Sequence, residues 1–279
     1  TGAPVISDQT PTEGQALTLD LTSISDPNGL GAFSFQWQSS PDGTVWTDIA
    51  GATAASFTPQ DLAGLAAGPQ AGLLLRAVVS FLDGAGNPET RTSAATGPVG
   101  TSWAGAGAND TFNGTAGDDI ANGNGGADTL NGNGGDDLLN GGIANDSLFG
   151  GAGLDTLIGG TGADRLWGDA GNDLVNGDAG NDRLFGGDGI DTLDGGAGAD
   201  RLAGGLLADV LNGGTGNDTI AGDEGDDLIV WNFTGATGGG RDLIDGGADL
   251  DTMQIDGDAT AETFRVYTRA SAILAGMTG

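Results

Sequence analysis

The stretch Gly150–Ile158, GGAGLDTLI, is one copy of the nine-residue unit that decides the fold of this chain. The unit recurs fourteen times from Gly105 to Val230 without an insertion or a deletion. Its first place is always Gly, its eighth place is always apolar, and its sixth place is always Asp. A fixed period of this kind indicates stacked repeats that bury a shared core. The aspartates at the sixth place are Asp110, Asp119, Asp128, Asp137, Asp146, Asp155, Asp164, Asp173, Asp182, Asp191, Asp200, Asp209, Asp218 and Asp227.

Each unit divides into a six-residue loop and a three-residue strand. Gly150, Gly151 and Gly153 allow backbone conformations that side chains forbid, so the loop can turn several carbonyl oxygens toward one point. Asp155 then closes the loop with a carboxylate. Calcium takes about six to eight oxygen ligands, which one loop cannot supply, so we expect a second loop to stack on the first. Two units form one coil, and loop n therefore lies about 4.8 Å from loop n+2.

The run Gly105–Val230 resembles the RTX (haemolysin-type) calcium-binding repeat over its whole length. The resemblance implies a parallel β-roll with one calcium ion between each pair of stacked loops. One loop would give the carbonyls of places one and three, the next would give those of places two and four, and both would give their Asp. Three sites implied in this way are Gly150, Ala152 and Asp155 with Asp169, Gly171 and Asp173; Gly159, Thr161 and Asp164 with Asp178, Gly180 and Asp182; and Gly168, Ala170 and Asp173 with Gly187, Gly189 and Asp191.

Charge indicates that the ions are obligatory. Seven loops on each edge leave six gaps on each edge, so we expect about twelve calcium ions. The repeats carry 23 acidic residues and three Arg, a net charge of −20 that about twelve Ca²⁺ ions would neutralise. Because only one place in nine is reliably apolar, the metal-free chain should not overcome its ordering entropy, and calcium binding should be coupled to folding. The alternative, a disordered Gly/Asp-rich tail, predicts neither the Asp phase nor the apolar eighth place.

Departures from the repeat predict weaker sites. The fourth place is Ala108, Ala144 and Leu207 instead of Gly, and the second place in the first four copies is Ala106, Thr115, Asn124 and Asn133. We expect the start of the roll, and the loop that contains Leu206 and Leu207, to bind calcium least tightly.

Residues 1–100 lack the repeat and predict an all-β sandwich. Strand-like runs alternate with turn signals, at residues 16–21, 33–38, 44–49, 56–58 and 73–81. The stretch FQWQSSPDGTVWTDIAGATAASFTP (residues 35–59) resembles bacterial immunoglobulin-like domains, which implies that Trp37 packs between the sheets. Trp46 is expected to be structural, with a ligand platform as the alternative. The sequence does not choose between a spacer and an adhesive module.

The outside of the roll should carry two unlike faces. Places seven and nine point outward, and copies two units apart stack. One face should therefore align Arg165, Arg183 and Arg201 beside Phe149, Trp167 and Phe185; the other should present Ile120, Leu138, Leu174, Val210 and Leu228. We favour stacking of the aromatic side chains on one another, with Arg over the rings. Contact with a sugar or a partner protein is the alternative.

Composition excludes several classes of function. A net charge of −31 should repel nucleic acid and anionic membranes. His and Cys are absent, which removes the usual zinc, copper and haem ligands, thiol nucleophiles, His-based triads and disulfides. No run approaches the roughly 20 apolar residues of a membrane span, so we expect no membrane insertion.

After Val230 the phase breaks, and one degenerate copy follows at Gly246–Gln254. We expect Trp231 and Phe233 to cap the open end of the roll. The expected domains are 1–100 (sandwich), 101–232 (roll) and 233–279 (degenerate repeat and cap). Neither a leader nor a type I secretion signal is evident, so we expect the chain to be a fragment of a longer protein. The last segment is similar to regions that follow RTX rolls in bacterial secreted proteins, including haem-peroxidase-like ones.

These patterns predict an all-β, non-catalytic, calcium-binding region of a secreted bacterial protein that leaves the cell through type I secretion machinery. It would serve as a folding module and extracellular spacer. One alternative is an adhesin that binds a glycan or a cell-surface ligand through the Arg and aromatic face. Another is a polysaccharide-acting enzyme with paired acids. We disfavour it because we expect the carboxylates to bind calcium and because the sequence implies no substrate cleft.

Overall fold

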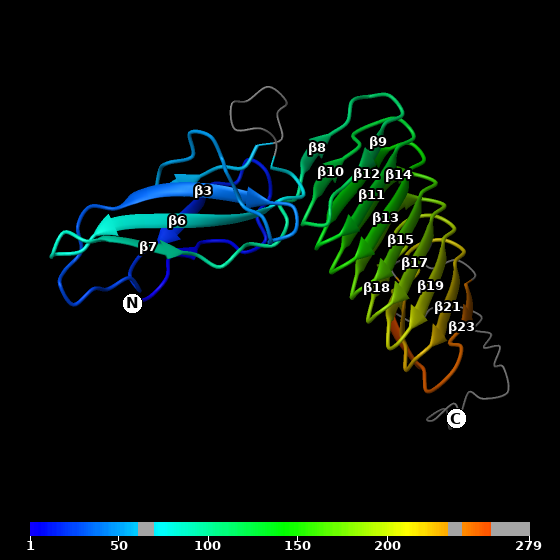
Figure 1. Cartoon of the computed structure of the whole chain (residues 1–279). Coiled ribbons are helices and arrows are strands. Elements are labelled where there is room, and N and C mark those ends of the chain that lie inside the picture. Colours follow the sequence, from blue (N-terminus) through cyan, green and yellow to red (C-terminus); the bar gives the residue numbers. More distant parts are fainter. Residues whose placement is uncertain (61–69, 234–241, 258–279) are drawn as a thin grey trace. The chain divides into compact units, whose positions relative to one another are not determined.

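The computed structural model describes residues 1–60, 70–233 and 242–257, which form β-strands and no helix (Figure 1). These residues divide into two compact units. Unit 1 comprises Thr1–Ser102 together with Gly114–Ile120, and unit 2 comprises Trp103–Asn113 and the described residues from Ala121 onward. The all-β class predicted from the sequence is confirmed.

Unit 1 contains two antiparallel sheets. The first has the order β1-β2-β5, formed by Val5–Ile6, Leu17–Asp20 and Ser56–Phe57. The second has the order β4-β3-β6-β7, formed by Thr47–Asp48, Ser34–Ser40, Leu74–Leu82 and Pro88–Thr92. Strands β2 to β6 correspond to the five predicted runs. Two further strands have no signal in the sequence: β1 has only two residues, and β7, with the sequence PETRT, has no apolar alternation.

The core of unit 1 lies between its two sheets. Trp37 is fully buried and packs with Ile6 and Leu17 from the first sheet and with Leu75 and Ala77 from the second. The predicted burial of Trp37 is therefore confirmed, while the immunoglobulin-like assignment stays a prediction.

Trp46 has structural contacts. The Arg76 guanidinium carbon lies 4.3 Å from its ring centroid, and the indole N–H donates a hydrogen bond to the Gly43 carbonyl at 3.0 Å. These contacts agree with the structural role that we favoured.

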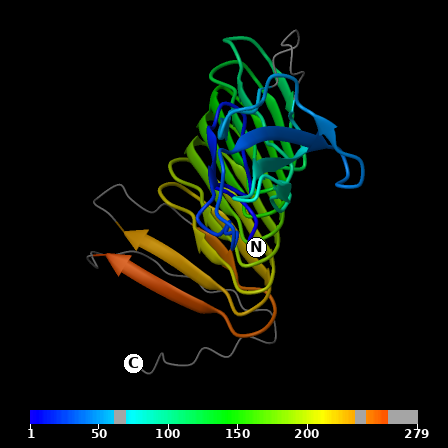
Figure 2. The same ribbon diagram turned by 60° about the vertical axis from the view of Figure 1, so that its left-hand side comes forward.

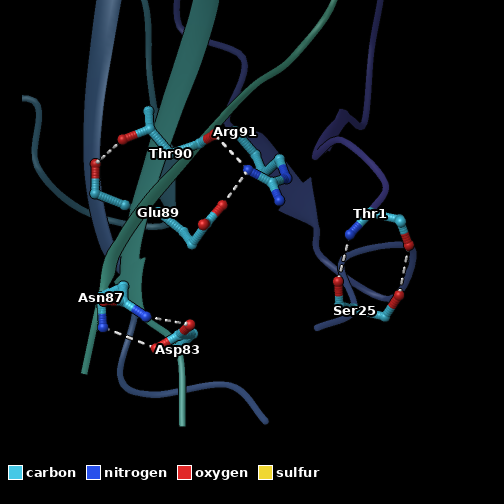
Figure 3. Close-up of polar contacts among 8 residues, drawn as sticks. Thr1, Ser25, Asp83, Asn87, Glu89, Thr90 and Arg91 are labelled. Atoms are coloured by element: carbon cyan, nitrogen blue, oxygen red, sulfur yellow. Dashed lines mark hydrogen bonds and ion pairs between the residues drawn. The ribbon is translucent and has the colours of Figure 1, made fainter. Parts of the chain in front are cut away.

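Polar contacts order the turn between β6 and β7 (Figure 3). The Asp83 carboxylate accepts hydrogen bonds from the backbone N–H of Ala85 at 2.9 Å and of Asn87 at 2.7 Å. Together with the Asn87 side chain, these donors hold the pKa of Asp83 below its usual value. On β7, Arg91 and Glu89 form an ion pair at 2.8 Å. These contacts fix the hairpin without contributing a candidate site.

Unit 2 is a parallel β-roll with two sheets, whose strands follow one another as rungs in both views (Figure 1 and Figure 2). One sheet contains β9 (Thr111–Asn113), β11 (Thr129–Gly134), β13 (Ser147–Ala152), β15 (Arg165–Ala170), β17 (Arg183–Asp188), β19 (Arg201–Leu206), β21 (Thr219–Glu224) and β23 (Leu243–Asp245). The other contains β8 (Ser102–Ala104), β10 (Ile120–Asn122), β12 (Leu138–Ile143), β14 (Thr156–Gly162), β16 (Leu174–Gly180), β18 (Thr192–Asp194), β20 (Val210–Asn212), β22 (Leu228–Phe233) and β24 (Thr252–Gly257).

The register of the roll pairs copy n with copy n+2, as predicted. Arg165 pairs with Arg183, for example, and Leu157 pairs with Val175. The eighth-place side chains consequently form one continuous column between the sheets: Phe112, Ala121, Leu130, Leu139, Leu148, Leu157, Leu166, Val175, Leu184, Leu193, Leu202, Leu211, Ile220 and Ile229. Trp103 and Ile244 pack against this column, and Trp103 stacks on Phe112 with ring centroids 5.4 Å apart.

The roll extends beyond the predicted end. Strand β22, which contains the buried Trp231, pairs with β24 on its outer side, so Trp231 does not cap the sheet. The side chain of Phe233 lies outside the described residues, as does the structure of residues 258–279. The sequence TGGGRDLID at residues 237–245 is a further copy of the repeat that was not predicted, because its first place is Thr237 instead of Gly.

Candidate calcium site

The invariant aspartates form two buried ladders along the roll. From Asp119 to Asp227 their relative exposure lies between 0 and 3%. The backbone N–H of Asp110, and of every Asp of the repeat from Asp128 to Asp227, donates to Oδ1 of the next Asp in its ladder; the Asp155 N–H, for example, donates to Asp173 at 2.8 Å. These bonds join Asp110, Asp128, Asp146, Asp164, Asp182, Asp200, Asp218 and Asp242 in one column, and Asp137, Asp155, Asp173, Asp191, Asp209, Asp227 and Asp251 in the other.

The second carboxylate oxygen is the unusual atom in these ladders. Oδ2 is buried and has no hydrogen-bond partner in Asp128, Asp146, Asp155, Asp164, Asp173, Asp182, Asp191, Asp200, Asp209, Asp218 and Asp227. A buried carboxylate oxygen without a partner is costly, and proteins supply such oxygens with a donor or a cation. The repetition of this atom along both ladders indicates a repeated cation site.

Gly at the first place leaves room for a cation beside this oxygen. A Cβ atom on Gly177 would lie 2.7 Å from Asp182 Oδ2 and 2.7 Å from the Gly195 carbonyl oxygen, which belongs to the next coil. Two oxygens from stacked loops thus converge on a space that only Gly leaves open. Calcium binds oxygens at about 2.3–2.6 Å and accepts a mixture of carboxylates and carbonyls. The residues present therefore fit calcium.

Other proposed carbonyl ligands take part in hydrogen bonds between loops. The Ala170 oxygen accepts from the Gly153 N–H at 2.9 Å, and the Asp178 oxygen accepts from the Ala197 N–H at 2.7 Å. A carbonyl oxygen has two lone pairs, so each retains one for a cation. The complete ligand sets, and the choice of loop that supplies each carbonyl, stay predictions.

Side chains alone do not complete a metal site in the part of the chain that the structure describes. No group of three or more acidic side chains there is close enough to hold a metal ion. Each loop instead contributes one buried Asp, surrounded by backbone groups of its own and the neighbouring loop.

The glycines at place four set the close approach of the loops. Gly171 has a φ of 144°, and a Cβ atom there would meet the Gly153 carbonyl oxygen. We therefore expect Gly171→Ala to lower the free energy of unfolding of the calcium-bound roll by about 1–3 kcal/mol or more. The measurement is the urea midpoint in millimolar calcium.

Position 144 provides the matched control, since Ala144 already occupies place four with a φ of 82°. Ala144→Gly should change stability by no more than about 1 kcal/mol. An equal effect of the two substitutions would contradict the close approach seen at Gly171.

The first two loops differ from the rest. The Ala106 N–H donates to Asp110 Oδ2 at 2.8 Å, and the Thr115 N–H donates to Asp119 Oδ2 at 2.7 Å. A peptide N–H thus binds the oxygen that later loops leave without a donor. The residue at place two explains this difference. Ala106 and Thr115 do not adopt the positive φ that Asn124 and the place-two residues of the later copies adopt. This arrangement supports the prediction of weak calcium binding at the start of the roll.

The loop with two leucines also departs from the pattern. Leu207 adopts a φ of 71° at place four, and the hydrogen bond from the Gly189 N–H to the Leu206 carbonyl lengthens to 3.4 Å. This looser stacking supports the prediction that calcium binds less tightly there.

Burial changes the acidity of the ladders. Desolvation raises the pKa of Asp200 and of Asp209 to about 7, and neighbouring carboxylates such as Asp182 beside Asp200 add to the shift. The same causes raise the pKa of Asp155 and of Asp191 to about 6. These values describe ladders without a cation, in which several stacked carboxyls hold protons near neutral pH.

A pH dependence follows for the metal-free roll. A raised pKa means that the folded state binds protons more tightly than the unfolded state, so the roll gains stability as pH falls. This gain is complete below about pH 4 and is lost as pH rises through about 7. Circular dichroism in calcium-stripped buffer should show more strand signal at pH 5 than at pH 8. The opposite slope would contradict the buried ladders.

The outer face brings the predicted aromatic side chains together. The ring centroids of Phe149 and Trp167 lie 4.6 Å apart with planes 4° from parallel, and those of Trp167 and Phe185 lie 5.5 Å apart at 8°. The predicted stacking is therefore present. The prediction that Arg side chains lie over these rings is wrong. The cation–π contacts of the described residues, Arg76 with Trp46 and Arg91 with Phe81, belong to unit 1.

Within the described ranges, no helix is long and apolar enough to cross a membrane.

A search of curated proteins found no significant match to the chain. The family model for a domain of unknown function (DUF8696) matches residues 2–66 and assigns no activity to unit 1. The family model for the RTX calcium-binding nonapeptide repeat (4 copies) matches residues 104–139, 140–175, 149–184, 176–210 and 204–230. Residues 104–230 are therefore RTX calcium-binding nonapeptide repeats, folded as a parallel β-roll around two ladders of buried aspartates.

Proposed function

We propose that unit 2 is a non-catalytic folding module of a secreted bacterial protein, in which calcium binding and folding are one event. The observation that carries the proposal is the row of buried Oδ2 atoms without a hydrogen-bond donor. Calcium would supply a positive charge to the carboxylates and bind the adjacent carbonyl oxygens. The chain's own contribution is to hold these oxygens in register between loops.

The small apolar core and the high negative charge of the roll support a requirement for calcium. The core of the roll contains a single column of eighth-place side chains, and the repeats carry a net charge of −20. Without cations, like-charged carboxylates stack one coil apart in a buried environment. Calcium removes this repulsion and couples its binding energy to folding.

The geometry also supports the expected number of ions. Each Asp from Asp128 to Asp227 is followed by another Asp of its own column, because Asp242 and Asp251 continue the two ladders. The loops of Asp110 and Asp119 are closed by N–H groups instead. One gap lies between each Asp from Asp128 to Asp227 and the next Asp of its column. These gaps correspond to about twelve ions.

The coupling of calcium binding to folding would serve a function in a secreted protein. RTX repeats are typical of secreted proteins. In low cytosolic calcium the roll would stay unfolded and could pass through type I secretion machinery. Outside the cell it would fold at about 0.1–1 mM calcium, the range of extracellular calcium modules. The folded roll would then serve as a rigid spacer in its parent protein.

Far-UV circular dichroism during a calcium titration of the whole chain tests the proposal. We expect a cooperative gain of strand signal with a midpoint of about 0.1–1 mM. Complete strand signal in excess chelator would refute coupled folding. A midpoint below about 1 μM would refute folding outside the cell, because cytosolic sensor sites already fill in that range.

A second candidate function, an adhesin that binds a glycan, is favoured by one observation. The face of β13 to β19 places arginines in register on a strongly acidic chain.

A further inference from the structure

The arginine strip, Arg165, Arg183 and Arg201, lies on the outer face of β15, β17 and β19. Arg165 pairs in register with Arg183, and Arg183 pairs with Arg201. All three side chains are exposed. Neighbouring strands are about 4.8 Å apart, so the strip presents a regular row of guanidinium groups along the roll.

Acidic residues are absent from the seventh-place and ninth-place columns of this sheet between β9 and β21, while the second-place column of the same strands contains Asp169 and Asp223. The seventh places are Thr111, Thr129, Ser147, Arg165, Arg183, Arg201 and Thr219, and the ninth places are Asn113, Asn131, Phe149, Trp167, Phe185, Ala203 and Ala221. The chain has 39 acidic residues and 8 Arg, so two adjacent columns with three aligned Arg and no acid are a marked departure from its composition.

Contacts within the chain do not explain the strip. The salt bridge that the described residues form joins Arg91 to Glu89, in unit 1. Asp169, which lies two residues after Trp167 on β15, forms no ion pair with the strip within 4.0 Å. Like charges directly opposite each other on neighbouring strands destabilise a sheet. The strip therefore costs stability and is available to an external anion.

Trp167 offers no open ring face on which a sugar could stack, because Phe149 and Phe185 cover its two sides. The three aromatic side chains instead form a stacked apolar row beside the column of arginines. Recognition on this face would depend on charge.

We propose that the arginine strip binds a linear anionic glycan that carries carboxylate or sulfate groups along its length. A guanidinium group pairs with such planar or branched oxyanions through two parallel hydrogen bonds. One exposed pair contributes little, whereas a polymer engages several Arg at once and gains from the high effective concentration of its further groups.

Calcium would control this binding, and the inference therefore rests on the proposed function. The register that aligns the strip exists only in the folded roll. Calcium would also offset the net charge of −20 on the repeats, which otherwise repels a polyanion. Nucleic acid fits less well, because its dense charge, one phosphate per about 1.7 Å of duplex, increases repulsion by the remaining acids.

Biolayer interferometry in millimolar calcium tests the inference on the whole chain. The immobilised probes are dextran sulfate for sulfate, hyaluronan for carboxylate, unmodified dextran as the neutral control and an oligo-thymidine strand for nucleic acid. We expect binding to at least one of the two anionic glycans and none to dextran, with loss of binding in excess chelator.

Two triple variants separate the strip from the rest of the face. Arg165→Thr, Arg183→Thr and Arg201→Thr together should weaken glycan binding by about tenfold or more. Thr111→Ala, Thr129→Ala and Thr219→Ala change the same column without a change in charge and should leave binding intact. If the arginine variant does not fold, Arg183→Thr alone should weaken binding by about two- to fivefold.

Three outcomes would overturn the inference: no binding to either anionic glycan, unchanged binding by the folded arginine variant, or oligo-thymidine binding as tight as glycan binding. The calcium titration by circular dichroism is read separately. A chain that folds with calcium but ignores both glycans overturns this inference alone, whereas a chain whose fold ignores calcium overturns the proposed function.

Discussion

In excess chelator at neutral pH, trypsin is expected to cut the chain rapidly at Arg165, Arg183 and Arg201, and millimolar calcium should suppress these cuts. All three residues lie on strands of the roll. Without calcium, the buried carboxylates repel one another and the single apolar column cannot hold the coils together. Because cleavage follows the population of the open form, we expect at least about 100-fold slower cutting in calcium.

Unit 1 provides the internal control for this experiment. Arg76 lies on β6 and Arg91 on β7, in a sandwich whose core contains Trp37 and no ladder of buried carboxylates. Cuts at these two residues should be slow with or without calcium. Equal resistance of the roll and the sandwich in chelator would contradict the calcium requirement.

Asp173→Asn is expected to have the second large effect, a loss of about 3 kcal/mol or more in calcium-bound stability. The amide keeps an oxygen that can accept the Asp155 N–H, which Oδ1 of Asp173 now accepts at 2.8 Å. It lacks the negative charge that a cation between stacked loops needs. The urea midpoint in millimolar calcium measures the loss.

Asp119→Asn is the matched control, because Asp119 occupies the same sixth place of the repeat in a loop that a peptide N–H closes. The Asp119 carboxylate already accepts hydrogen bonds from the N–H of Thr115 at 2.7 Å and from the hydroxyl of Thr101 at 2.7 Å. Its replacement should cost about 1 kcal/mol, the value of ordinary hydrogen bonds. Equal losses at positions 119 and 173 would show that the two carboxylates have the same role, contrary to this account.

The sequence predicted the parts of the fold that depend on periodicity. The nine-residue period predicted coils of two units, and the pairing of Arg165 with Arg183 confirms that register. The apolar eighth place predicted the core column, and alternation around Trp37 predicted its burial in unit 1. These predictions succeeded because a strand exposes alternate residues to opposite sides.

Other features depend on backbone conformation that the pattern alone does not determine. The N–H groups of Ala106 and Thr115 close the first two loops, and the available signal was the absence of Gly, Asn or Asp at place two. The copy that contains Asp242 was missed because its first place is Thr237. The bond from each Asp N–H to the next carboxylate has no signal in the sequence, since it depends on the side-chain conformation.

Counting the calcium ions bound to the intact chain by native mass spectrometry tests the central claim most directly. The gaps between stacked loops, each with a buried Asp carboxylate, predict about twelve ions per chain, and Asp173→Asn should reduce that number. Binding of only one or two ions, or an unchanged number in the Asp173→Asn variant, would contradict calcium binding by the aspartate ladders.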